Sequence, residues 1–134
     1  MELGLFIGFI SFFITALLLV IVFLYLYAIV TPYDDYKLIF EDNNLAAALG
    51  FGGAIIGVSI PLYSALVHST SYLDFVIWGV VAILIQLIFA FIVTRLGGKY
   101  SFKTKVSEGI ISVGIFMAFL SISIGLLNAG SMSY

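Results

Sequence analysis

The chain has 134 residues, of which 63% are hydrophobic and only 9% are charged, and its mean hydropathy is +1.28. A soluble domain is about 45–50% apolar and about 25% charged, so this composition excludes an ordinary soluble domain and indicates a protein whose solvent is lipid. The net charge of −2 provides no basic surface for binding nucleic acid. Because the sequence has no cysteine, it forms neither disulfides nor thiolate metal sites.

Four apolar runs without a charged residue cover 3–30, 45–67, 75–94 and 109–127. A helix needs about 20 residues to cross the hydrocarbon, whereas a barrel strand needs about 10 residues of alternating polarity. We therefore predict an all-α integral membrane protein with transmembrane helices at about 3–30, 45–67, 74–95 and 108–128. The first run lacks a basic start and a small-residue cleavage site, so we expect a helix rather than a signal peptide.

The basic residues predict the orientation, because all five lie in the loops 31–44 and 95–108. By the positive-inside rule both loops are cytoplasmic and both termini lie outside. In the first loop, Thr31 is expected to cap a short helix. That loop is acidic and the second is basic, so we expect the two loops to attract each other. The charged residues that carry this prediction are Asp34, Asp35, Glu41 and Asp42, with Lys99, Lys103 and Lys105 opposite.

An eight-residue phrase occurs twice, as VSIPLYSA at 58–65 and as ISIGLLNA at 122–129, with four identical positions. Each copy falls in the second helix of a helix–loop–helix half. Because two spans return the chain to the same side, both halves insert the same way up. The phrase therefore predicts two tandem two-helix repeats, 1–67 and 68–134, related by a pseudo-two-fold axis along the membrane normal.

The repeat places Pro61 and Gly125 at matching depths in the membrane. Proline donates no backbone hydrogen bond and displaces the carbonyl four residues earlier, at Gly57, which nearby hydroxyls are expected to satisfy. Matching interruptions in two halves mark the binding sites of transporters, although kinks stabilised by neighbouring helices are more common. Gln86 is expected to make an interhelical hydrogen bond or to contact a solute. The candidate polar path consists of Ser59, Pro61, Ser64, Gln86, Ser123, Gly125 and Asn128.

Small residues form a face on each of the predicted helices 45–67 and 108–128. Such faces let helix backbones approach closely, which van der Waals packing in lipid requires. We therefore expect these two helices to be the inner pair, with the other two facing lipid or a second subunit. The packing residues are Gly50, Gly53, Ala54 and Gly57 on one helix, and Gly114 and Ala118 on the other.

The remaining polar residues predict helix ends rather than chemistry. Ser71 and Asp74 have the spacing of a capping box at the start of the third helix, and Glu108 is expected to begin the fourth. A single histidine, His68, cannot build the usual zinc site. No nucleophile–base pair or phosphate loop is evident, so we expect no enzymatic activity, no metal and no cofactor.

Several phrases in order resemble a known family: TPYDD at 31–35, NNLAAA at 43–48, GAIIG at 53–57, IPL at 60–62 and GLLNA at 125–129. This set resembles domain-of-unknown-function family 350, the YjfL type of small bacterial inner-membrane protein. The resemblance implies a four-helix inner-membrane protein with an internal duplication and no settled activity. One departure is that the family repeats an Asn-x-Ala-Ala phrase at the start of the last helix, where this chain reads SEGII at 107–111.

Two functions fit these features. The first is a structural, homo-oligomeric component of the envelope that docks a cytoplasmic or membrane protein through its charged loops. The second is a small channel or transporter that uses the interruptions at Pro61 and Gly125. We favour the first because no ionisable residue lies deep in a predicted helix.

Overall fold

The computed structural model describes residues 2–132, and every regular element in them is helical. Four helices are long and apolar enough to cross a membrane, so the predicted all-α membrane architecture is confirmed. The elements are α1 Glu2–Val30, α2 Asp35–Phe40, α3 Leu45–His68, α4 Tyr72–Arg95, the 3-10 turn η1 Gly98–Tyr100, α5 Phe102–Ser107 and α6 Ile111–Ser131.

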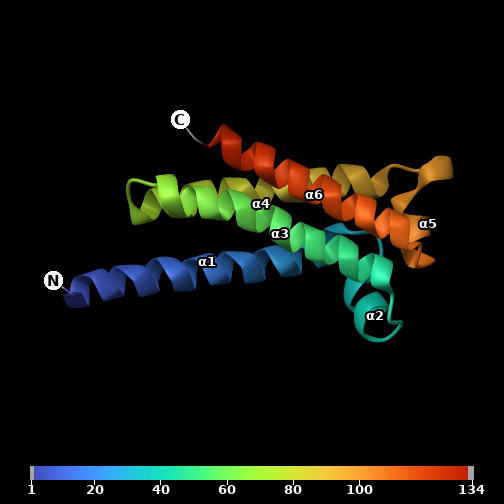
Figure 1. Ribbon diagram of the computed structural model, residues 1–134, viewed down its shortest axis with the longest axis horizontal. Coiled ribbons are helices and arrows are strands. Elements are labelled where there is room, and N and C mark those ends of the chain that lie inside the picture. The colour runs from blue at the N-terminus through green and yellow to red at the C-terminus, as the bar shows by residue number, and fades with distance from the viewer. Residues whose placement is uncertain (1, 133–134) are drawn as a thin grey trace.

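The long helices run lengthwise through the molecule, and the short ones gather at one end (Figure 1). Both ends of the described chain and the connection from α3 to α4 lie at the opposite end. We call the end formed by α2, η1 and α5 the loop end. In each half of the chain a long helix is followed by a short helix and a second long one, which is the order that two tandem repeats would give.

Side-chain caps begin most of these helices. Asp34 accepts a hydrogen bond from the backbone N–H of Lys37 at 3.1 Å, so α2 begins at Asp35. The expected cap by Thr31 is wrong, because that residue is buried and precedes α2 in a bend. The predicted cap of the third long helix is confirmed: the Ser71 hydroxyl accepts from the N–H of Asp74 at 3.1 Å.

The last helix begins later than the sequence predicts. Glu108 does not open α6; its N–H donates to the Thr104 carbonyl at 3.0 Å and closes α5. Gly109 then turns the chain with a φ of +79°, a conformation that favours glycine, and α6 starts at Ile111. The physical reason is that the short helix α5 buries Phe102 and Val106, so residues 102–107 form a separate element.

The most extensive contact between elements joins α3 to α6. An ideal Cβ on Gly53 would lie 2.3 Å from Ala118 Cα, and one on Gly114 would lie 2.4 Å from the Ala46 carbonyl oxygen. Gly50 faces the Met117 side chain. The structure thus places the small faces of α3 and α6 against each other, with Ala54 buried beside them.

The interruption at Pro61 lies inside this contact. Pro61 is fully buried and α3 continues through it. Three of the four side chains expected to satisfy the carbonyl of Gly57 bond elsewhere. Ser59 donates to Ile55 at 2.7 Å, Ser64 donates to the Ala129 carbonyl on α6 at 3.2 Å, and Asn128 donates to Ala82 and Gln86, while the fourth, Ser123, is exposed. Instead Gly125 of α6 packs on that carbonyl, and an ideal Cβ there would lie 2.1 Å from its oxygen. This close approach is typical of the Cα–H···O contacts that recur between helices.

We expect Gly125→Ala to destabilise the bundle, because the new methyl group meets a rigid backbone carbonyl. The cost of such overpacking is about 1–3 kcal/mol, so the apparent melting temperature in detergent should fall. Gly130→Ala on the same helix is the matched control, because nothing lies within 4 Å of its ideal Cβ. Equal melting temperatures for both variants would contradict the close α3–α6 contact.

Candidate functional site

A buried pair of side-chain amides links α4 to α6. Gln86 and Asn128 are each 5% exposed. The Asn128 Nδ2 donates to Gln86 Oε1 at 3.4 Å and to the Ala82 carbonyl at 3.3 Å, and Gln86 Nε2 donates to the Ser121 carbonyl at 3.4 Å. Gln86 therefore makes an interhelical hydrogen bond, the first of the two roles predicted for it.

The other polar residues of the predicted path do not join this pair. Ser59 and Ser123 are exposed on the outside of the bundle, where their hydroxyls would face lipid. Ser64 is buried against α6, and the carbonyl of Ser64 lies 2.9 Å from Nδ1 of His68 at the end opposite the loop end. The described residues thus form separate polar contacts rather than one continuous row of side chains.

A small cavity of about 30 Å³ lies between α1, α4 and α6. That volume holds about one water molecule. Tyr27, Gln86, Thr94 and Ser121 contribute its polar lining. Tyr27 is 1% exposed, and within residues 2–132 neither its hydroxyl nor the Oδ1 of Asn128 has a hydrogen-bond partner. Leaving such atoms unpaired is costly. Tyr27 lines this cavity and Asn128 does not, so the Tyr27 hydroxyl is the group best placed to bind a small polar molecule there.

A buried carboxyl lies at the start of α2. Asp35 is 1% exposed and accepts a hydrogen bond from the Thr31 hydroxyl at 2.5 Å. Burial raises the pKa of this carboxyl from 3.8 to about 7; the Thr31 bond opposes the shift and the nearby Asp34 adds to it. The sequence grouped Asp35 with the exposed loop charges. The structure instead makes Asp35 a group whose charge changes near neutral pH.

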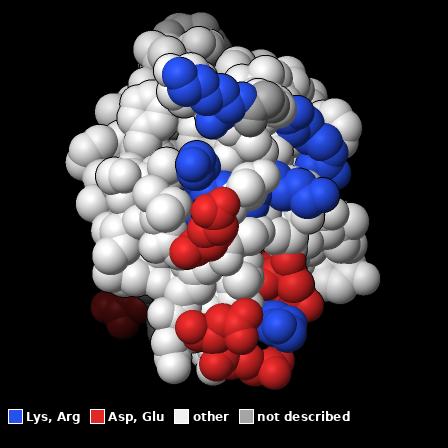
Figure 2. All heavy atoms as spheres, turned by 90° about the vertical axis from the view of Figure 1, so that its right-hand side faces the viewer, with Lys and Arg blue, Asp and Glu red and all other residues white. Residues whose placement is uncertain are grey.

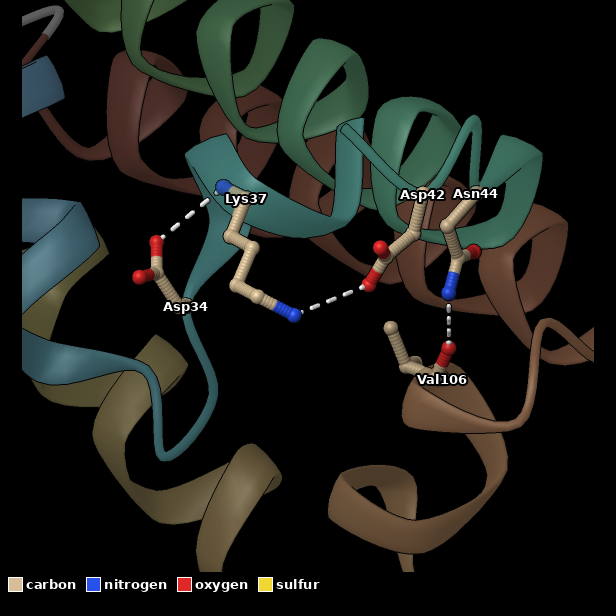
Figure 3. Close-up of polar contacts among 5 residues, drawn as sticks. All are labelled: Asp34, Lys37, Asp42, Asn44 and Val106. Atoms are coloured by element: carbon tan, nitrogen blue, oxygen red, sulfur yellow. Dashed lines mark hydrogen bonds and ion pairs between the residues drawn. The ribbon is translucent and has the colours of Figure 1, made fainter. Parts of the chain in front are cut away.

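The two loops meet through a hydrogen bond rather than through their opposite charges (Figure 3). The ion pair among residues 2–132 is Lys37 with Asp42 at 3.5 Å, and both belong to the first loop. Asn44 caps α3 by accepting from the Ala47 N–H at 2.9 Å, and its Nδ2 donates to the Val106 carbonyl at 2.8 Å. The expected electrostatic attachment of the loops is therefore not what the structure shows.

An open hollow of about 320 Å³ lies where the two loops meet, and Asn44 is part of its lining. Asp42 and Glu108 contribute carboxylates to its lining, and Leu38, Leu45 and Ile111 contribute apolar surface; Asn43, Asn44, Ser107 and Gly109 complete it. Figure 2 shows most of the acidic side chains of the loop end over the lower part of the face and most of the basic ones over the upper part, with an acidic side chain near the middle between them. This acidic hollow suits a cationic group rather than an anion.

Sequence reasoning missed two of these residues, Asn44 and Tyr27, and named a third, Asp35, only as an exposed loop charge. Asn44 follows a recognisable signal, a cap residue before an apolar run, but its second bond to Val106 depends on the tertiary structure. The buried tyrosine Tyr27 and the buried carboxyl of Asp35 have no local signal, because their burial depends on which helices cover them.

We expect the stability of the protein to fall as the pH rises from about 4 to about 7. In this range the folded state keeps the Asp35 proton while the unfolded chain releases it, so the folded state binds more protons. The slope is at most about 1.4 kcal/mol per pH unit. Asp35→Asn should flatten the pH dependence of the melting temperature between pH 5 and 7, as its amide keeps an acceptor for Thr31.

Asp34→Asn is the matched control, since asparagine also caps helices and Asp34 is exposed. This variant should retain most of the wild-type slope, because Asp34 is the smallest of the three influences on the pKa of Asp35. A wild-type slope in Asp35→Asn would show that another group controls the pH dependence.

The chain is similar to small membrane proteins of two bacteria. The chain is 35% identical over 132 residues to the UPF0719 inner membrane protein YjfL of Escherichia coli K12, covering 95% of this chain and 94% of that protein. It is 29% identical over 116 residues to the UPF0719 transmembrane protein YshE of Bacillus subtilis, covering 87% and 84% respectively. No solved structure matches the chain.

The model of the domain of unknown function DUF350 matches residues 1–132. This range includes all four membrane-spanning helices and both loops. The chain therefore belongs to the DUF350 family of small membrane proteins.

Proposed function

We propose that this protein is a homo-oligomeric structural component of the bacterial inner membrane that docks a positively charged partner at its loop end. The observation that carries the proposal is the acidic hollow between the loops. Its two carboxylates, on Asp42 and Glu108, come from opposite halves of the chain, so the hollow exists only in the folded bundle. Glu108 has no ion-pair partner among residues 2–132, which leaves it available for a cation on another molecule.

The orientation identifies the kind of partner. All five basic residues lie at the loop end, so the positive-inside rule supports a cytoplasmic location for 31–44 and 95–108 and an outside location for both termini. The partner is then a cytoplasmic protein or the cytoplasmic segment of a membrane protein. Its contact residues would be Lys or Arg flanked by apolar side chains, to match the mixed lining of the hollow.

The exposed face of α1 is the surface on which a second copy would pack. In the most apolar 18-residue stretch of α1 none of the residues is buried within one copy. Large side chains such as Phe6, Phe9 and Phe13 point away from the bundle. A second copy would pack on this face through van der Waals contacts of the aromatic side chains, because lipid gives no hydrophobic driving force between helices. The helix order in the two halves separately supports the proposed duplication.

Catalysis has no part in the proposal. The Ser64 hydroxyl lies 3.3 Å from His68 Nδ1, but this hydroxyl is buried and contacts the Ala129 carbonyl at 3.2 Å. A nucleophile needs access to its substrate and a base that is oriented by a third group. Neither requirement is met by this contact in residues 2–132.

Site-specific photocrosslinking in bacterial cells that express the chain tests the docking. A photoreactive amino acid at Ser107, in the lining of the hollow, should yield a crosslinked protein. Reversing both carboxylates with Asp42→Lys and Glu108→Lys should reduce the yield at least about tenfold, because like charges repel across an interface.

The same photoreactive amino acid at Ser131, an exposed position on α6 far from the hollow, is the control and should not capture that protein. An unchanged crosslink in the charge-reversed variant would contradict docking at the acidic hollow.

Transport is a second candidate, favoured by one specific observation. The cavity beside Tyr27 and Gln86 and the unpaired Oδ1 of Asn128 give a polar molecule hydrogen-bonding partners inside the membrane. The close α3–α6 contact at Gly57 and Gly125 argues against a passage through the centre of one copy. A transporting form would need movement of α4 relative to α6.

Cysteine labelling separates the two candidates, because the sequence contains no native cysteine. If the bundle is dry, Gln86→Cys should resist a membrane-impermeant thiol reagent, whereas Ser107→Cys at the loop end should react within minutes when that end faces the reagent. Rapid labelling at Gln86→Cys would instead show that water reaches the middle of the membrane and would favour transport.

A further inference from the structure

The basic residues of the loop end form a group of their own. Arg95 ends α4, Lys99 lies in η1, and Lys103 and Lys105 lie on α5. We call these four residues the basic corner. In Figure 2 most of the basic side chains gather over the upper part of the face, with an acidic side chain bordering them near the middle. The ion pair among residues 2–132 joins Lys37 to Asp42, so no residue of the basic corner forms an ion pair within the described chain.

Aromatic rings hold two of these cations at the edge of the bundle. The Arg95 guanidinium lies 4.5 Å from the ring centre of Phe91, and Lys99 Nζ lies 5.5 Å from the ring centre of Tyr100. Phe91 is 51% exposed and Tyr100 is 78% exposed, so both rings face the surroundings of the bundle. Tyr side chains are enriched at the boundary between hydrocarbon and headgroups, and Arg95 ends the spanning helix α4 at the same end of the bundle. The two cations are therefore held at headgroup level.

The short helix α5 positions the other two cations. Its buried residues Phe102 and Val106 attach it to the bundle, and Val106 also accepts the hydrogen bond from Asn44. Lys103 is exposed and Lys105 is half-buried on this anchored helix. The basic corner is thus a fixed group of cations rather than a set of charges on a flexible loop.

We propose that the basic corner binds the phosphate groups of anionic phospholipids, such as phosphatidylglycerol, in the leaflet next to the loop end. Phosphates lie at headgroup level in either leaflet. The lipid site therefore requires only that the four helices cross the membrane, and it does not depend on which side the loop end faces or on the partner proposed for the acidic hollow. Basic clusters next to a spanning helix attract anionic lipids, and each cation adds to the attraction. The acidic α2 side repels the same lipids, so they gather along α4 and α5 only.

Native mass spectrometry of the full-length protein in neutral detergent tests this inference. Wild-type protein should bind phosphatidylglycerol more tightly than phosphatidylcholine with the same acyl chains. Each basic residue near a membrane surface strengthens the binding of anionic lipid about fivefold. The triple variant Lys99→Gln, Lys103→Gln, Lys105→Gln should therefore lose on the order of a hundredfold in its preference for phosphatidylglycerol. Raising the salt concentration should weaken the preference of the wild type, because ions screen exposed charges.

Lys37→Gln is the matched control, since it removes a basic residue of the same end that is already paired with Asp42. This variant should keep the wild-type preference for phosphatidylglycerol. An equal loss in Lys37→Gln and in the triple variant would overturn the inference, because net charge rather than the basic corner would then be responsible. Complete competition by millimolar inorganic phosphate would also overturn it, as the corner would then be a site for free phosphate.

Discussion

The structure depends on the close approach of the α3 and α6 backbones. Lipid offers no hydrophobic driving force between helices, so van der Waals contact has to hold the bundle together, and this contact needs small residues. Three places on these helices come so close that a Cβ would collide with backbone atoms, at Gly53, at Gly114 and at the pair Gly57–Gly125. The remaining helices are arranged around this pair, with α4 in contact with both and α1 against α3 and α4.

Pro61 has a specific part in this contact. Proline leaves the Gly57 carbonyl without its helical donor, and the polar atom lies in the middle of an apolar bundle. Gly125 covers that carbonyl from the neighbouring helix. Pro61 and Gly125, which match in the repeated phrase, thus both act on the carbonyl of Gly57: the first removes its donor and the second covers it. In the sequence, the interruption at Pro61 and Gly125 suggested a transport site. In the structure it also has a packing role, and that role requires no solute.

The two ends of the molecule differ in what they offer to other molecules. The end with the α3–α4 connection carries few charges and packs Ser64 and His68 against α6 and each other. The loop end has an acidic hollow, a basic corner and the buried carboxyl of Asp35. Because Asn44 ties the two loops together at Val106, the hollow and the corner keep fixed positions relative to each other. The proposed partner and the proposed lipid headgroups therefore have separate places at the same end.

The sequence by itself determined the membrane environment, the four spans and most helix starts, because hydrophobic runs and cap residues are local properties of the chain. It also identified the small residues that lie between α3 and α6, since their spacing repeats with the helical period. Only the tertiary structure decided the rest. Ser59 and Gln86 look equally polar in the sequence, but one is exposed and the other is buried and bonded to Ser121. Likewise the charge of Asp35 depends on its burial, and burial is a property of the folded bundle rather than of any short stretch of residues.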